Sequence, residues 1–185
     1  MRIIVGITGA TGTIYGVRLL EILKNIEDIS VYLVMSEWAK QNLEIETEYT
    51  LDYVKGLADF NCEYRDLASG ISSGSFITEG MVILPCSMKT LGSIANGFDD
   101  NLISRAASVM IKESRKLVLC PRETPLSSIH LENMLKLSRI GVKLVPPMPA
   151  FYNNPKTIDD IINHHIMKVL DQFGISIDKA KRWKS

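Results

Sequence analysis

The sequence predicts a single-domain α/β fold, a doubly wound parallel sheet of the Rossmann-like or flavodoxin-like kind. Short apolar, β-branched runs alternate along the chain with segments whose apolar residues recur at helical spacing. A glycine-rich turn, Gly9-Ala10-Thr11-Gly12, joins the first run to the first helical segment. The 185 residues contain no internal repeat and no linker, and this length suits one compact domain.

Five apolar runs are expected to be strands, because the strands of a parallel sheet are covered on both faces. They span residues 2–7, 30–35, 80–85, 116–120 and 142–145. Helices are expected at residues 14–23, 37–46, 87–95, 101–114, 128–140 and 158–173, with Ser36 as the N-cap of the second. Residues 47–78 predict only a short helix followed by a polar loop at 69–75.

The composition excludes several classes of function. Lys and Arg together number 21, as do Asp and Glu, so no broad electric field attracts nucleic acid or an anionic membrane. Cys62, Cys86 and Cys120 lack C-x-x-C spacing and are expected to be buried thiols in a reducing compartment. The chain opens directly in a strand and has no apolar run of ~20 residues, which predicts a cytoplasmic protein.

The glycine turn is the first candidate ligand site. In doubly wound sheets, ligands bind beyond the carboxyl ends of the strands, and free N–H groups at a helix start bind phosphate. A purely structural turn and an NAD(P) site of the short-chain dehydrogenase kind are the alternatives. The second strand has no acid at its tip for a ribose, although Glu37 follows closely. Pro155 also interrupts the Tyr152–Lys156 pair, so a mononucleotide fits better.

Further candidates lie at other strand ends. Residues 87–90 follow the strand at 80–85 and open a helix, which gives either a second anion contact or a simple serine N-cap. Arg105, Ser108 and Lys112 form a polar helical stripe that is by default a solvated face. Arg122 and Glu123 follow another strand, where a guanidinium can bind phosphate and a carboxylate can carry a proton, or where both are surface charge.

The histidines argue against a metal site. His164 and His165 are adjacent and point about 100° apart on a helix. His130 has no Cys or His partner at the spacing of a metal site. We therefore expect no metal, and no Ser-His-Asp arrangement is present either.

Several distinctive segments, taken together, resemble one family. They are GITGATG (6–12), PCSMKTL (85–91), NLISRAA (101–107), RETP (122–125), HLENM (130–134) and PAFY (149–152). Over essentially its whole length the chain resembles the flavin prenyltransferase (UbiX) family. SEWA (36–39) and LDQFGI (170–175) look closest to members described as the small (B) subunit of hydroxyarylic-acid decarboxylases.

The resemblance implies one flavin-binding domain over residues 1–185 and a metal-independent prenyl transfer. A dimethylallyl group from dimethylallyl phosphate would join N5 and then C6 of reduced FMN, releasing phosphate. The prenylated FMN would serve a separate UbiD-type aromatic-acid decarboxylase. The family also forms homododecamers with sites shared between subunits, and the tail at about 174–185 is expected to reach the active site or a neighbouring subunit.

The resemblance also implies roles for individual residues. FMN would be held by Gly9, Ala10, Thr11, Ser36, Ser87, Met88, Lys89, Thr90 and Arg122. Tyr152 and Lys168 would bind dimethylallyl phosphate, with Arg105 and Lys112 adding positive charge near its phosphate. Glu46 and Glu123 stand at the positions of the family's carboxylates, and Glu123 is the candidate for proton transfer during ring closure. Trp183 would face the prenyl group.

Two positions depart from the common pattern of the family. Thr11 replaces a Ser that many members carry, which keeps the hydroxyl and stiffens the side chain. Lys168 replaces a common Arg, so a bidentate contact becomes a point charge. We expect weaker binding of dimethylallyl phosphate and retained activity.

Two other functions remain as alternatives. One is an FMN-dependent decarboxylase of the phosphopantothenoylcysteine type, which relies on an early histidine, whereas the first histidine here is His130. The other is a non-enzymatic FMN carrier, which would not need the charged set of Arg105, Lys112, Arg122 and Glu123.

Overall fold

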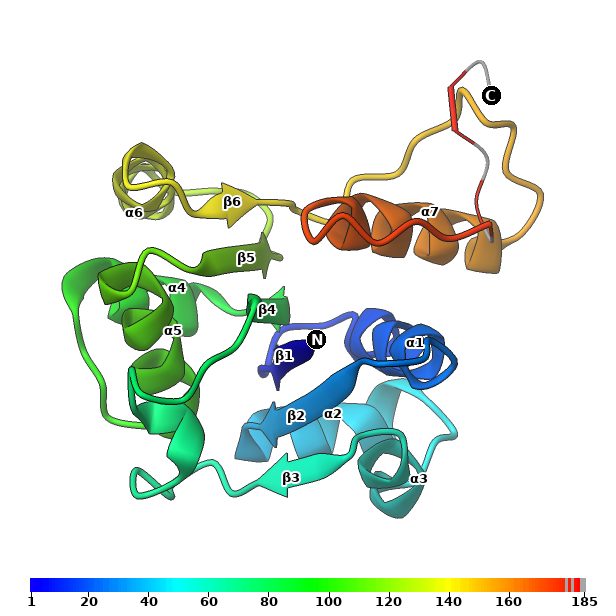
Figure 1. Ribbon diagram of the computed structural model, residues 1–185. Helices are drawn as coiled ribbons and strands as arrows, with labels where there is room; N and C mark the ends of the chain where they lie inside the picture. The colour runs from blue at the N-terminus through cyan, green and yellow to red at the C-terminus, as the bar shows by residue number, and fades with distance from the viewer. Residues whose placement is uncertain (179, 181, 184–185) are drawn as a thin grey trace.

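Among the described residues, six strands form one parallel sheet in the order β3-β2-β1-β4-β5-β6 (Figure 1). The computed structural model describes residues 1–178, 180, 182 and 183. The strands are β1 Arg2–Ile7, β2 Ser30–Met35, β3 Phe60–Cys62, β4 Gly80–Cys86, β5 Lys116–Pro121 and β6 Lys143–Leu144. The helices are α1 Thr13–Lys24, α2 Glu37–Glu46, α3 Leu51–Gly56, α4 Met88–Asn96, α5 Leu102–Lys112, α6 Ser128–Arg139 and α7 Ile158–Asp171, with a 3₁₀ turn, η1, at Gly70–Ser72. This is the order of a Rossmann-like doubly wound sheet, so the predicted fold class is confirmed.

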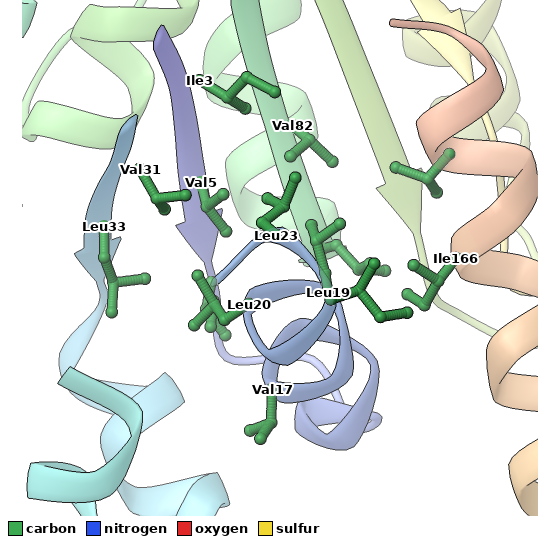
Figure 2. Packing of buried hydrophobic residues seen from close by; sticks show 14 of the residues in the cluster. Ile3, Val5, Val17, Leu19, Leu20, Leu23, Val31, Leu33, Val82 and Ile166 are labelled. Carbon is green, nitrogen blue, oxygen red and sulfur yellow. The ribbon is translucent and has the colours of Figure 1, made fainter. Parts of the chain in front are cut away.

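Helices cover both faces of the sheet, because successive strand residues point to opposite sides. Val5 of β1 lies in the core with α1, α2, α3 and α7, whereas its neighbour Ile4 lies in the core with α4, α5 and α6. Figure 2 shows Leu20 of α1 near Val5, and Ile166 of α7 on the far side of α1. Both faces are thus buried, as the continuous apolar strands require.

Gly16 allows α1 to lie close against the sheet. A side-chain carbon at this position would lie 2.7 Å from the carbonyl oxygen of Leu84 and 2.8 Å from the Ile7 side chain. A glycine is therefore needed one turn into α1 for the helix to begin where β1 and β4 end. Strand order reverses between these two strands, which makes their carboxyl ends the expected ligand position.

The edge strands differ most from the sequence prediction. β3 lies in the segment where no strand was expected, and it pairs parallel with β2 through Tyr32 and Phe60. The two rings stack with centroids 4.4 Å apart. β3 has only three residues and no buried apolar run, so it forms by pairing with β2. β6 is likewise two residues long, Lys143–Leu144, within the predicted 142–145.

The cysteines are free, and their burial follows the prediction in part. Cys86 and Cys120 are buried, while Cys62 is half-buried on β3. Burial raises the pKa of the Cys120 thiol well above its ordinary value, so this group stays protonated and unreactive. Within the described part of the chain, no helix has both the length and the apolar character to cross a membrane.

Candidate active site

Thr8 ties together the ends of β1 and β4. Its hydroxyl donates to the carbonyl oxygen of Pro85 at 2.8 Å and accepts from the Ser87 N–H at 2.8 Å. The side chain is almost fully buried, so these bonds are protected from water. The glycine turn and the start of α4 are thereby fixed relative to each other.

Of the helices that begin at this edge of the sheet, α2 and α4 are each capped by a serine. The Ser36 hydroxyl accepts from the Ala39 N–H at 3.1 Å and opens α2. The Ser87 hydroxyl accepts from the Thr90 N–H at 3.3 Å and opens α4. The Ser36 cap was expected from the sequence, and the Ser87 cap was one of two alternatives. Because the other first-turn N–H groups have no partner within their helix, both ends favour an anion.

A pocket of about 460 Å³ lies between these helix starts. This switch-point pocket is lined by Thr8, Gly9, Ser36, Glu37, Trp38, Tyr64, Arg65, Ser87, Lys89 and Thr90. Its volume is in the range of small-molecule sites, and its hydroxyls, two cations and aromatic rings suit a mononucleotide with a flat ring system. The residues present therefore fit FMN.

Five of the nine residues expected to hold FMN line this pocket, and Ala10, Met88 and Arg122 lie next to lining residues, whereas the Thr11 side chain bonds Glu46. Ala10 continues the turn, and its carbonyl accepts from Asn42 of α2 at 3.4 Å. Met88 is the first residue of α4 and packs against the core. The Arg122 N–H donates to the Cys86 carbonyl at 3.1 Å, which places Arg122 next to Ser87.

Five of the ten lining residues had not been assigned to FMN from the sequence, and three of these five are Trp38, Tyr64 and Arg65. Trp38 lies on α2, two residues after the Ser36 cap, and the residue is 66% exposed. Tyr64 and Arg65 enter the pocket from the segment after β3. Only the position of Trp38 beside a predicted N-cap gave a signal, because β3 itself was not predicted.

Gly9 forms the closest backbone approach in the pocket. A side-chain carbon at Gly9 would lie 2.5 Å from the Cβ of Trp38, a distance that real atoms do not adopt. The turn therefore passes directly under Trp38 only because Gly9 has no side chain.

Glu46 occupies the start of α1. One of its carboxylate oxygens accepts the N–H groups of Gly12 and Thr13 at 2.9 and 3.0 Å. Burial works to raise the pKa of Glu46, but hydrogen bonds from the Thr11 side chain and these two N–H groups hold it below its ordinary value. This corrects one expectation from the sequence. The helix-start donors expected to bind a phosphate are bonded to this chain's own carboxylate.

Glu123 extends beyond β5, next to Arg122. Both side chains are exposed, and the Glu123 carboxylate accepts the N–H of Thr124 at 3.1 Å. Arg122 and Glu123 thus lie at the sheet edge that holds the switch-point pocket, without lining its wall within one chain.

Tyr152, Lys168 and Trp183 belong to a second group, at α7. The Tyr152 and Trp183 rings meet edge to face with centroids 5.4 Å apart. Lys168 is exposed on α7, one turn after His164, which contacts Tyr152. Arg182 pairs with Asp171 at 2.6 and 2.9 Å, so the tail returns to the end of α7. Residues 179, 181, 184 and 185 of the predicted 174–185 tail lie outside the described residues.

Arg105 and Lys112 form a third group, on α5. Arg105 pairs with Asp99 at 3.3 Å, and Lys112 pairs with Glu113. Both line an open hollow of about 580 Å³ with the polar segment 72–75. Ser108 of the predicted stripe donates to Asp99 at 2.6 Å, so the stripe is partly paired.

One chain does not bring the three groups together. The helices that carry them cover opposite faces of the sheet, α5 on one and α7 on the other (Figure 1). Neither α5 nor α7 contributes a residue to the switch-point pocket.

The histidine geometry agrees with the sequence expectation. His164 faces Tyr152, whereas His165 faces Tyr15 with ring centroids 5.1 Å apart. Among the described residues, no group of three or more His, Cys, Asp or Glu side chains could hold a metal ion.

Comparison with known proteins places the chain in a family. A family profile described as Flavoprotein matches residues 1–170. Flavin prenyltransferase LpdB of Lactiplantibacillus plantarum is 58% identical over 183 residues, which cover 99% of this chain and 98% of that protein. The chain belongs to the flavin prenyltransferase (UbiX) family.

Two solved structures related to UbiX have nearly the same fold. The dodecameric FMN-dependent UbiX-like decarboxylase of Escherichia coli O157:H7 is 57% identical, with a TM-score of 0.98 over 100% of both chains. AnUbiX, solved in complex with FMN and dimethylallyl pyrophosphate, is 46% identical, with a TM-score of 0.97 over 100% of this chain and 97% of that chain. Because the chain belongs to the UbiX family, the glycine turn is part of a flavin-binding domain, and the NAD(P) interpretation is wrong.

Proposed function

We propose that this chain is a flavin prenyltransferase that transfers the dimethylallyl group of dimethylallyl phosphate to N5 and C6 of reduced FMN. The observation that carries the proposal is the switch-point pocket, which suits FMN in a chain that resembles flavin prenyltransferases over its full length. The flavin supplies the nucleophilic atoms when it is bound and reduced. The chain's own residues must then bind it, stabilise the departing phosphate and exclude water.

The flavin is held by the residues at the strand ends. Gly9, Ala10 and Thr11 give a flat backbone surface, and Ser36, Arg122 and residues 87–90 supply donors. The two capped helix starts and the cation of Lys89 favour the ester phosphate of FMN. Trp38 and Tyr64, which also line the pocket, offer apolar faces to a flat ring.

Cations must bind the leaving phosphate more strongly as its charge develops. Lys168 and the Tyr152 hydroxyl lie together at α7, whereas Arg105 and Lys112 lie on the opposite face of the sheet. A complete phosphate site therefore needs more than one subunit. We propose a homododecamer, the assembly of the Escherichia coli O157:H7 relative.

Carboxylates and aromatic rings serve the carbon chemistry. Glu123 carries a proton during ring closure, since it is exposed at the sheet edge beside Arg122. Glu46 holds the glycine turn through the N–H groups of Gly12 and Thr13. Tyr152 and Trp183 present ring faces to the allyl cation and keep water from it.

The product, prenylated FMN, would pass to a UbiD-type decarboxylase in the cytoplasm. This part of the proposal follows from the family resemblance. The protonated thiol of Cys120, with Cys86 also buried and free, is consistent with a reducing compartment.

Anaerobic incubation with reduced FMN and dimethylallyl phosphate tests the function. Mass spectrometry of the extracted flavin should show FMN plus one C5 unit. A Ser36→Ala variant, which removes a pocket hydroxyl and the α2 cap, should form less product. Unchanged FMN in the presence of folded, FMN-bound wild-type protein would overturn the proposal.

A further inference from the structure

His164 contacts Tyr152, one of the two residues proposed to bind the prenyl donor. Its Nε2 lies 2.6 Å from the Tyr152 hydroxyl, and the side chain is 5% exposed. We propose that His164 is a positioning residue, which holds the Tyr152 hydroxyl so that its proton points to the phosphate of the prenyl donor. The inference rests on the proposed function and adds a residue that the family resemblance did not assign.

Tyr152 needs such a support because its own backbone is irregular. It lies in residues 146–157, which contain neither a helix nor a strand. Its ring is held edge to face between two others, His164 at 5.3 Å and Trp183 at 5.4 Å between centroids. The hydrogen bond to His164 is the contact that fixes the direction of the hydroxyl, because ring packing leaves its proton free to rotate.

Among the described residues, four charged or titratable groups face this pair. Lys168 and Asp171 follow His164 on α7, and His165 is its neighbour in the chain. Arg182, from the tail, interacts with Tyr152. Burial and then the Lys168 charge lower the pKa of His164, against the opposing effect of Asp171. The imidazole is therefore neutral at pH 7 and has one N–H. With that proton on Nε2, His164 donates to the Tyr152 oxygen, and Tyr152 can donate only outward.

His165 shows that this arrangement is not a general property of buried histidines on α7. Its ring packs against Tyr15, and its buried Nε2 has no hydrogen-bond partner among the described residues. Burial lowers the pKa of His165 to about 4. It is the same residue type on the same helix, without the contact to Tyr152, and so provides a matched control.

Two substitutions separate the hydrogen bond from ring packing. His164→Phe keeps an edge-to-face ring and loses the donor, whereas His164→Gln keeps a donor amide. We expect His164→Phe to lower kcat/KM for dimethylallyl phosphate about fivefold to tenfold, which corresponds to about 1–1.4 kcal/mol, the usual net contribution of one hydrogen bond. His164→Gln should recover part of this loss, and His165→Phe should have no effect.

The double variant decides whether His164 acts through Tyr152. In a Tyr152→Phe background, His164→Phe should cause no further loss, because the hydroxyl it orients is absent. An equal loss in both backgrounds, or no loss in the single variant, would overturn the inference. Unchanged FMN affinity in His164→Phe would show that the fold is intact, since the switch-point pocket contains no residue of α7.

A binding measurement distinguishes failure of this inference from failure of the proposed function. Calorimetric titration of the FMN-loaded protein with dimethylallyl phosphate requires no turnover. If the wild type binds the ester more tightly than His164→Phe but makes no prenylated flavin, the positioning role survives and the proposed reaction is wrong. If the wild type is active and both proteins bind the ester equally well, the positioning role is wrong.

Discussion

At the scale of single residues, Gly9 decides whether the pocket can exist. We predict that Gly9→Ala weakens FMN binding at least tenfold and destabilises the protein by about 1–3 kcal/mol, the usual cost of overpacking. The new methyl group would have to displace Trp38, which lies 2.5 Å away. FMN titration and thermal unfolding measure the two effects.

Gly56→Ala is the matched control, because nothing lies within 4 Å of the position where its methyl group would stand. It should leave FMN affinity unchanged and either preserve or slightly raise stability. If Gly9→Ala behaved like this control, the close approach to Trp38 would have no functional meaning.

Glu46 makes the free energy of unfolding depend on pH through its hydrogen bonds to the glycine turn. Its pKa is lowered in the folded protein, so its carboxylate stabilises the fold above the unfolded value of 4.5. That contribution is lost as pH falls through the lower, folded value. Glu46→Gln should therefore be less stable than wild type at pH 7, by about 0.5 kcal/mol for a charge at a helix N-terminus.

Urea unfolding at a series of pH values tests this prediction. The difference between wild type and Glu46→Gln should shrink as pH falls below 4.5 and close once the pH is below the lowered pKa of Glu46 in the folded protein. A gap that stays constant down to pH 3 would mean that the carboxylate charge contributes nothing to the turn.

At the scale of elements, an ion pair between Arg182 and Asp171 joins the described part of the tail to α7. Asp171→Asn removes the charge that Arg182 binds at 2.6 and 2.9 Å. Because exposed pairs contribute only about 0–1 kcal/mol, overall stability should hardly change. The contact between the Trp183 and Tyr152 rings should weaken. KM for dimethylallyl phosphate should therefore rise severalfold in steady-state assays.

Asp159→Asn is the comparison for this prediction. Asp159 pairs with Arg18 at 3.0 Å at the opposite end of α7, so the variant loses a similar charge without touching the tail. Equal effects of both substitutions on KM would assign the change to α7 as a whole instead of to the tail.

The strands and helices differ in how well the sequence predicts them. β1, β2 and β4 and most helices were predictable, because apolar periodicity and serine caps are local properties. β3 was not, since Phe60 and Asn61 are exposed and form a strand only by pairing with β2. Tyr64 and Arg65 were missed for that reason. Glu46 was assigned to the site, but its hydrogen bonds to Gly12 and Thr13 depend on how α2 ends near α1.

At the scale of the whole molecule, the predicted site is divided among separate surfaces. The residues proposed to hold FMN lie at the strand ends, those proposed to bind the prenyl donor lie at α7, and Arg105 and Lys112 lie beside the segment 72–75. Large apolar side chains such as Phe98, Ile129 and Phe151 are also exposed, at 67%, 67% and 72%. A closed oligomer would bury such side chains and bring the surfaces of different subunits together.

Mixed oligomers test whether one site uses two subunits. Lys112→Ala and Glu123→Gln should each abolish most activity, because each removes a group from every site. Co-expression of the two variants in equal amounts should restore about a quarter of wild-type activity, if a site takes its Lys112 from one chain and its Glu123 from another. Random pairing gives both intact residues to one site in four. If both groups came from the same chain, no mixed site would contain the two intact residues. Mixing would then recover nothing, and the proposal that one site combines Lys112 and Glu123 of different subunits would be wrong.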